Sequence, residues 1–218
     1  MKLYFVRHGK TEWNLESRYQ GAGGDSELLT DSYQEMKMVG NYLKDIPFAH
    51  VYSSPIKRAR VTAAVINDEL RHPVSLSLDN RLEEFRLGKF EGMKFTDAEA
   101  QYPDTFNDFR NHPDQYDPTP IGGESFPDLI KRMQSKISEI TANFNGDDEI
   151  LIVSHGAALN ALINSLLRIP LQDLRKRGGL ANTSTTILET NDHGQSFKLL
   201  DWNDTSYLEH PVRDSDLV

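Results

Sequence analysis

The stretch LYFVRHG at residues 3–9 decides how the rest of the chain is interpreted. Its four leading apolar residues predict a short strand that is buried on both faces, as strands of parallel sheets usually are. Arg7, His8 and Gly9 follow at the carboxyl end of this strand. Because ligands of open α/β sheets bind outside the carboxyl ends of the strands, the stretch predicts an α/β fold with a polar site at this strand end.

Short apolar runs and helical patterns alternate along the chain. The clearest helix is expected over 125–144, where apolar residues recur at steps of three and four. Further strands are predicted at 50–53, 74–78, 150–153, 185–188 and 197–202, and further helices at 55–70 and 157–167. This alternation predicts a three-layer α/β sandwich, in which helices flank a mostly parallel central sheet.

The length of 218 residues fits a single domain, 1–218. Within it, residues 94–123 are rich in Pro, Asp and aromatic residues. We predict that they form a helical and loop insertion over the active site that acts as a substrate lid. A surface excursion without a role in binding is the alternative. Residues 206–218 are expected to form a partly ordered tail.

The composition excludes several classes of function. The chain has 24 Lys and Arg against 33 Asp and Glu, a formal charge of −9, which disfavours nucleic acid and anionic membranes as partners. The lack of cysteine excludes thiol catalysis and disulfides. The apolar run at 3–6 is too short for a signal peptide, and polar residues interrupt the apolar stretch 149–170. We therefore expect a soluble cytoplasmic protein.

Two further strand ends carry residues of the same kind as the first. One predicted strand leads into Ser154-His155-Gly156, and another leads toward Arg58. If the three strands are parallel neighbours, two histidines and two arginines meet in one pocket. Arginine offers planar donors that match phosphate oxygens, and Asn14 adds a neutral donor. A phosphoryl group is the simplest ligand for such a pocket.

His8 is the candidate nucleophile of this pocket. The flanking arginines are expected to lower the pKa of its imidazole, and a backbone carbonyl is expected to hold its other ring nitrogen. Attack on phosphorus would form a phosphohistidine that water then hydrolyses, while the arginines and His155 stabilise the charge on the phosphoryl oxygens. A carboxylic acid must protonate the leaving group, and spacing alone does not separate Glu83, Glu84 and Glu91.

Several short motifs follow one another in a specific order along the chain. They are RHG at 7–9, Thr11, Glu12 and Asn14, Gln20-Gly21, SSP at 53–55 with Arg58, GGES at 122–125, and SHG at 154–156. In this order the chain resembles the histidine phosphatase superfamily, in its phosphoglycerate-mutase-like branch. The resemblance runs from residue 3 to about residue 208.

The resemblance implies roles for individual residues. The nucleophile and the residues that bind the phosphoryl group would be His8, Arg7, Arg58 and His155. Glu84 is selected over Glu83 as the proton donor, because it lies four residues before Gly88, which precedes the aromatic-Glu-Gly segment 90–92. We further predict substrate contacts from Asn14, Gln20, Gly21, Gly156 and Ala157. The resemblance implies no metal and no organic cofactor.

Two positions depart from the family's pattern. Lys10 follows Gly9 where small, acidic or amide residues are commoner, and we expect it to face solvent, with a role in anion binding as the alternative. Tyr33 replaces a glycine near the start of a helix, which concerns the packing of that helix and not the chemistry.

Three rival functions are weighed against hydrolysis. A zinc hydrolase could use His8, His155 and Glu84, but no metal-ligand spacing supports it. A non-catalytic phosphate-binding module would keep the pocket without turnover. The glycolytic mutases of the family carry a Tyr-Gly-x-Leu segment after the catalytic Glu and a paired arginine in the insertion, whereas this insertion offers only Arg110. We therefore predict a phosphohydrolase that acts on a small phosphomonoester. The sequence specifies neither the identity of this substrate nor the oligomeric state.

Overall fold

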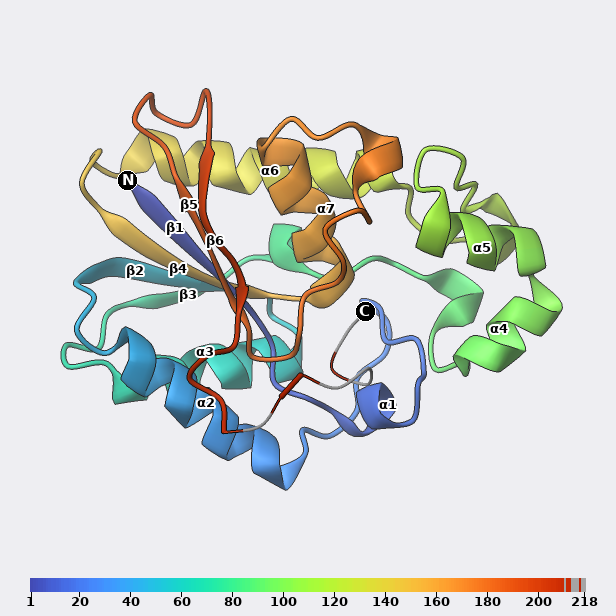
Figure 1. The fold of residues 1–218 in the computed structure, drawn as a ribbon, viewed down its shortest axis with the longest axis horizontal. Coiled ribbons are helices and arrows are strands. Elements are labelled where there is room, and N and C mark those ends of the chain that lie inside the picture. Colours follow the sequence, from blue (N-terminus) through green and yellow to red (C-terminus); the bar gives the residue numbers. More distant parts are fainter. Residues whose placement is uncertain (210, 213–215, 217–218) are drawn as a thin grey trace.

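A computed structural model describes residues 1–209, 211, 212 and 216 (Figure 1). The strands are β1 (Lys2–Arg7), β2 (Phe48–Ser53), β3 (Leu76–Leu78), β4 (Glu149–Ser154), β5 (Thr185–Glu189) and β6 (Lys198–Asp204). The helices are α1 (Glu12–Leu15), α2 (Thr30–Leu43), α3 (Lys57–Glu69), α4 (Phe95–Gln101), α5 (Pro103–Asn111), α6 (Phe126–Asn143) and α7 (Gly156–Leu166). The tail predicted at 206–218 lies partly outside the described residues.

The six strands form one sheet in the order β3-β2-β4-β1-β5-β6. The first four in this order are parallel, and the hairpin of β5 and β6 adds an antiparallel edge next to β1. Helices α2 and α3 cover one face of the sheet, and α6 and α7 cover the other (Figure 1). The predicted three-layer sandwich with a mostly parallel sheet is therefore confirmed.

The apolar run of β1 is continuous because both faces of the strand are covered. Leu3 and Phe5 belong to the core that contains α6 and α7, whereas Tyr4 and Val6 belong to the core that contains α2 and α3. Successive side chains of a strand point to opposite faces, so each residue of the run has an apolar partner layer. Strand β4 divides its residues between the two cores in the same way.

Helix α6 begins where the sequence places its start. The Ser125 side chain accepts a hydrogen bond from the Asp128 backbone N–H at 3.2 Å, and Pro127 lies in the first turn, where a missing N–H costs nothing. One face of the helix is buried against the sheet. The helix predicted over 125–144 is thus confirmed.

Helix α2 accommodates the large residue at position 33. Tyr33 is 39% exposed, while Met36, Val39 and Leu43 form the buried face of the helix. The replacement of a glycine by tyrosine therefore places a side chain toward solvent and leaves the packing of α2 intact.

The three strand ends singled out in the sequence are neighbours. Arg7 of β1 pairs with Ser154 of β4 in parallel register, and Ser53 of β2 pairs with Val153 on the other side of β4. His8 and His155 are the next residues of their strands, so they leave the sheet at the same level. This register brings the residues of the candidate site together.

The segment 94–123 contains α4 and α5, which lie beyond one end of the sheet (Figure 1). The Phe109 ring packs edge-on against Phe85 at a centroid distance of 5.3 Å, and lies 5.6 Å from the Phe126 ring. Aromatic contacts thus join the segment to the core around α6. Among the described residues, no helix is both long enough and apolar enough to span a lipid bilayer.

Candidate active site

His8 has both ring nitrogens in contact with fixed groups. Its Nδ1 lies 2.7 Å from the Gly9 carbonyl oxygen, and the Nε of Arg58 donates to its Nε2 at 3.2 Å. A carbonyl only accepts, so Nδ1 carries the proton and Nε2 presents its lone pair. Burial, followed by the charges of Arg58 and Arg7, holds the pKa of His8 well below its ordinary value. The imidazole is therefore neutral at pH 7.

Arg7 is the last residue of β1, and its side chain is fully buried. Its Nη1 donates to the carbonyl oxygens of Leu180 and Asp216 at 2.5 Å each. Its Nε has no hydrogen-bond partner among the described residues. Burial lowers the pKa of Arg7 to about 10, which leaves the guanidinium charged at pH 7. The unpaired Nε is a donor that a ligand can use.

Arg58 lies in the first turn of α3, and its guanidinium is held by the loop at 20–25. Its two terminal nitrogens donate to the carbonyl oxygens of Gln20, Gly21 and Gly24 over 2.8–3.2 Å. It also contacts a carboxylate oxygen of Asp25 at 3.3 Å. These contacts fix the side chain so that its Nε points at His8.

His155 lies beside His8 at the end of β4. The two ring centroids are 5.2 Å apart, and His155 Nε2 lies 2.8 Å from the Ser54 hydroxyl. Burial, then the charges of Arg58 and of His8, lower the pKa of His155 well below its ordinary value. The two histidines and two arginines predicted to meet do lie together.

Glu84 is buried at the amino end of α7. Its carboxylate accepts hydrogen bonds from the backbone N–H groups of Ala157 and Ala158 at 3.1 and 2.8 Å, and from that of Phe85 at 2.9 Å. Burial raises the pKa of Glu84 above its ordinary value, although these three donors act in the opposite direction. A buried carboxyl with a raised pKa is the form that can donate a proton near neutral pH.

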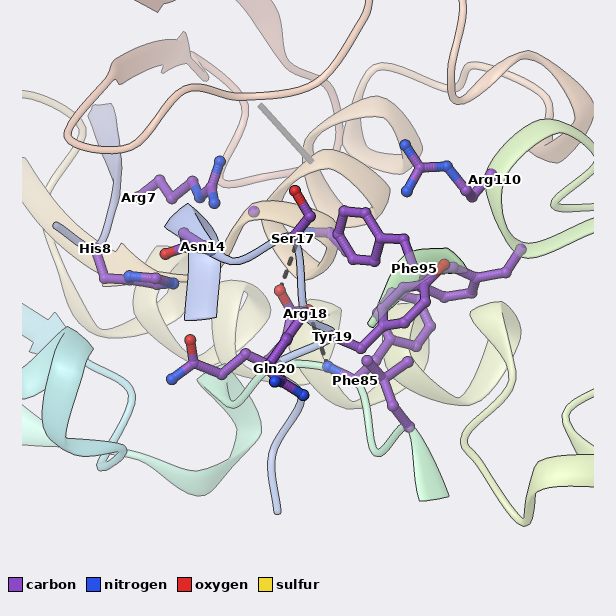
Figure 2. Close-up of a pocket in the computed structure, with 15 residues that line it drawn as sticks. Arg7, His8, Asn14, Ser17, Arg18, Tyr19, Gln20, Phe85, Phe95 and Arg110 are labelled. Carbon is purple, nitrogen blue, oxygen red and sulfur yellow. Dashed lines mark hydrogen bonds between the residues drawn. The ribbon is translucent and has the colours of Figure 1, made fainter. Parts of the chain in front are cut away.

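A pocket of about 410 Å³ opens in front of Arg7, His8 and Glu84 (Figure 2), whereas the buried side chains of Arg58 and His155 do not line it. Arg7, His8 and Glu84 line one part of it, and the apolar side chains of Phe85, Leu87, Phe95 and Phe109 line another. Two of these rings, Phe95 and Phe109, come from the segment 94–123, which therefore forms part of the wall. The arrangement joins a cationic phosphoryl-sized site to an apolar chamber.

The predicted substrate-binding residues divide into two groups. Asn14, Gln20, Gly156 and Ala157 line the pocket. Gly21 does not, and its carbonyl instead supports Arg58. The N–H of Ala157 is engaged by Glu84, so the amino end of α7 holds the carboxylate rather than an open anion site.

The remaining predictions for the site have mixed outcomes. Lys10 was expected to face solvent, and this is wrong, because it is only 8% exposed and its Nζ lies 2.6 Å from an Asp216 carboxylate oxygen. Glu91, one of the three candidate proton donors, instead accepts hydrogen bonds from the N–H groups of Gly21, Gly23 and Leu87. Among the described residues, no three His, Cys, Asp or Glu side chains group as metal ligands do.

Sequence reasoning missed several residues that position the site. The Asn182 amide donates to the His8 carbonyl at 3.0 Å, and the Thr62 hydroxyl accepts from the Gly9 N–H at 3.0 Å. Arg132 on α6 donates to the Glu84 carbonyl at 2.8 Å. Thr62 follows Arg58 at one helical turn, which is a usable signal. No local pattern distinguishes Asn182 or Arg132.

Comparison with known proteins agrees with this geometry. The sequence model of the histidine phosphatase superfamily (branch 1) matches residues 3–205. The chain belongs to this superfamily. Among curated relatives, phosphoglycerate mutase-like protein 4 of Arabidopsis thaliana is 32% identical over 209 residues, which cover 95% of this chain and 87% of the relative.

Solved structures of the histidine phosphatase superfamily have the same fold. The structure titled Bacillus stearothermophilus YhfR aligns with a TM-score of 0.87 at 32% identity, over 94% of this chain and 98% of that one. A mycobacterial glucosyl-3-phosphoglycerate phosphatase, solved in complex with VO3, aligns with a TM-score of 0.83 at 28% identity, over 94% and 99%. The resemblance stated from the motifs is confirmed, and the relatives include proteins named as mutases and as phosphatases.

Proposed function

We propose that this histidine phosphatase superfamily member hydrolyses small phosphomonoesters through a phosphohistidine intermediate on His8. The observation that carries the proposal is the state of His8: a neutral imidazole whose Nδ1 is fixed by the Gly9 carbonyl and whose Nε2 lies against Arg58, at the wall of a pocket. An unprotonated, oriented nitrogen among cationic donors is what attack on a phosphoryl group requires.

The reaction proceeds in two displacements. In the first, the Nε2 lone pair forms a bond to phosphorus while the bond from phosphorus to the ester oxygen breaks. The ring then carries a positive charge, which the Gly9 carbonyl stabilises through the Nδ1 proton. In the second, water attacks phosphorus and the N–P bond breaks, which releases phosphate and returns His8 to its neutral form. Arg7 Nε is a donor for the phosphoryl oxygens, and Arg58 Nε, which donates to His8 Nε2 in this structure, transfers its hydrogen bond to a phosphoryl oxygen as Nε2 attacks. One such donor contributes about 3–4 kcal/mol to transition-state stabilisation.

Glu84 provides the proton for the leaving oxygen in the first step. In the second step the same carboxylate, now ionised, accepts a proton from the attacking water. Its burial beside the pocket and its raised pKa support this assignment over Glu83 and Glu91. Neither Glu83 nor Glu91 lines the pocket, whereas Glu84 does.

We assign hydrolysis rather than mutase activity because the Tyr-Gly-x-Leu segment of the glycolytic mutases is absent from 85–92 and the segment 94–123 offers only Arg110. Residues 94–123 act in this proposal as a lid whose rings contact the leaving group. The mycobacterial neighbour named as a phosphatase acts on a sugar-linked phosphoglycerate by its title, which supports a small phosphorylated metabolite as the substrate class.

Quenching the protein in alkaline detergent after brief reaction with a ³²P-labelled phosphomonoester tests the proposal. The label is expected on His8 as an acid-labile, base-stable phosphoramidate, and His8→Ala is expected to lose the label and at least about 10³-fold in rate. His50→Ala is the matched control, since His50 lies on β2 and contacts Ser77 away from the pocket. Undiminished hydrolysis by His8→Ala would falsify the mechanism. Efficient phosphoglycerate isomerisation with little phosphate release would assign a mutase instead.

A further inference from the structure

A second cationic chamber adjoins the pocket at a distance from His8. It has a volume of about 300 Å³, and Tyr19, Phe109 and Arg110 line both it and the main pocket. Arg175 completes its charged lining. Figure 2 shows His8 and Arg110 on opposite sides of the main pocket. The two chambers are therefore neighbours that share part of their lining, with cationic groups at both ends.

Aromatic rings hold the two guanidinium groups of the second chamber in place. The guanidinium carbon of Arg110 lies 5.0 Å from the Phe95 ring centre and 5.5 Å from that of Phe106. That of Arg175 lies 5.5 Å from the Phe109 ring centre, and its Nη2 donates to the Phe109 carbonyl at 3.2 Å. Stacking on rings orients an arginine without neutralising its charge.

No carboxylate neutralises this pair. Among the described residues, neither Arg110 nor Arg175 forms an ion pair, and no acidic residue lines the second chamber. By contrast, Arg132 is paired with Glu124 at 2.7 Å. Burial, followed by the charge of Arg110, lowers the pKa of Arg175 to about 10, so the Arg175 guanidinium stays charged at pH 7. Two like charges in one chamber of an acidic protein call for an anionic ligand.

Two buried donors belong to residues that line this chamber. The Tyr19 side chain is 4% exposed, and its hydroxyl, which lies beside Arg110, makes no hydrogen bond of normal length and angle among the described residues. The Nε of Arg175 is also buried without a partner. Buried polar groups are nearly always hydrogen-bonded, so donors left open beside a cavity indicate where a ligand binds.

We propose that Arg110, Arg175 and the Tyr19 hydroxyl bind a second anionic group of the substrate, at the end of the leaving group away from the transferred phosphoryl group. The substrate class is a phosphomonoester whose leaving group passes the rings of Phe85 and Phe95 and ends in a carboxylate or a second phosphate. The assignment of the leaving-group side rests on the proposed function, whereas the anion site itself does not.

Binding of non-hydrolysable phosphonates tests the anion site without catalysis. Isothermal titration calorimetry would compare phenylphosphonate with 4-carboxyphenylphosphonate, and hexylphosphonate with 6-phosphonohexanoate. A second arm replaces each carboxylate with a phosphonate, which distinguishes the two anion sources. In at least one pair, the doubly anionic compound is expected to bind about tenfold more tightly than its parent, because guanidinium donors in a partly desolvated site favour it.

Single-residue variants test whether the higher affinity for the doubly anionic compound depends on the three proposed residues. Arg110→Gln and Arg175→Gln are each expected to reduce the affinity ratio within a pair toward one, and Tyr19→Phe to reduce it in part. The ratio is insensitive to any loss of folded protein. Arg60→Gln, on an exposed position of α3, is the matched control and should keep the wild-type ratio.

Two results would overturn the anion site: equal affinities within every pair for the wild-type protein, or a ratio that survives both arginine substitutions. Hydrolysis of phenyl phosphate is measured alongside and reports on the proposed function alone. Absence of that hydrolysis with an intact affinity ratio would reject the phosphatase assignment and keep the anion site.

Discussion

His8 and Glu84 are buried groups whose pKa values shift in opposite directions. Burial and two neighbouring arginines lower that of His8, and burial raises that of Glu84. In the proposed mechanism, the imidazole attacks only when it is unprotonated, and the carboxyl group donates to the leaving oxygen only when it is protonated. Activity should therefore rise as the pH increases through the pKa of His8 and fall as the pH increases through that of Glu84.

Glu84→Gln is expected to remove the alkaline limb of the pH profile of kcat/KM, because the amide neither titrates nor donates a proton to the leaving oxygen. Hydrolysis of an alkyl phosphate should fall by about 10²–10³-fold, and that of 4-nitrophenyl phosphate, whose leaving group needs no proton, by much less. Stopped assays with both substrates between pH 4 and 9 provide the measurement. Glu83→Gln serves as control and should keep both limbs; an alkaline limb that persists in Glu84→Gln contradicts the assignment.

At the residue scale, the sequence predicts the residues of the candidate site better than the residues that hold them in position. Strand-end position identifies His8 and His155, because side chains at the carboxyl ends of parallel neighbours converge. The choice among Glu83, Glu84 and Glu91 needed a family register, because adjacent glutamates have the same chemistry until burial separates them. Asn182 was missed because its contact with the His8 carbonyl joins residues 174 positions apart.

At the junction between β4 and α7, the backbone of Gly156 lies close to the side chain of Arg7. A Cβ on Gly156 would lie 2.9 Å from Arg7 Nε, the donor that has no protein partner. Arg7 cannot easily retreat, since its Nη1 is held by the carbonyls of Leu180 and Asp216. The small residue at 156 thus keeps space for Arg7 and for the ligand that Arg7 contacts.

Gly156→Ala is expected to displace Arg7 and to weaken binding of inorganic phosphate or vanadate by about tenfold, with a smaller change in Tm. Competitive inhibition constants and thermal melts are the two measurements. Gly146→Ala is the control, since an added Cβ at 146 meets nothing within 4 Å. Unchanged inhibition constants in Gly156→Ala would show that Arg7 adapts without loss.

The elements themselves were predictable to within a few residues where periodicity is strong. The helix expected over 125–144 is α6, and the apolar runs at 3–6 and 150–153 are strands β1 and β4. The strand order was not predictable, because it depends on pairings between distant segments that leave no local pattern. The segment 94–123 stands out by its composition, yet its two helices α4 and α5 were not predicted individually, since Pro103 separates them and both are short.

At the scale of the whole molecule, Asp216, near the end of the chain, contacts residues of the candidate site. The Asp216 carbonyl accepts from Arg7 Nη1 and from the Asn182 N–H, while its side chain pairs with Lys10. The expectation that Lys10 faces solvent failed because its partner lies 206 positions away. Such a contact is a property of the folded chain and has no trace in the local sequence.

A double-mutant cycle with Lys10→Met and Asp216→Ala measures how much the interaction between these two side chains contributes to the free energy of unfolding. We expect a coupling free energy of about 1–3 kcal/mol in urea unfolding. Both side chains are largely buried, so either substitution leaves the charge of the other residue less well compensated. The exposed pair of Lys176 and Asp173 is the control and should couple by less than about 0.5 kcal/mol. Equal coupling free energies in the two cycles would mean that the Lys10–Asp216 contact stabilises the fold no more than an exposed ion pair does.

The pocket has walls of two different origins, and this bears on how the protein can diverge. Its reacting groups stand at the ends of paired strands, where a one-residue slip would move His8 away from His155. The opposite wall comes from a segment outside the sheet, which carries Phe95, Phe109 and Arg110. If the proposed function holds, substitutions in that segment can exchange one preferred substrate for another without changing the groups at the strand ends. A directed-evolution library confined to 94–123 exploits the same separation.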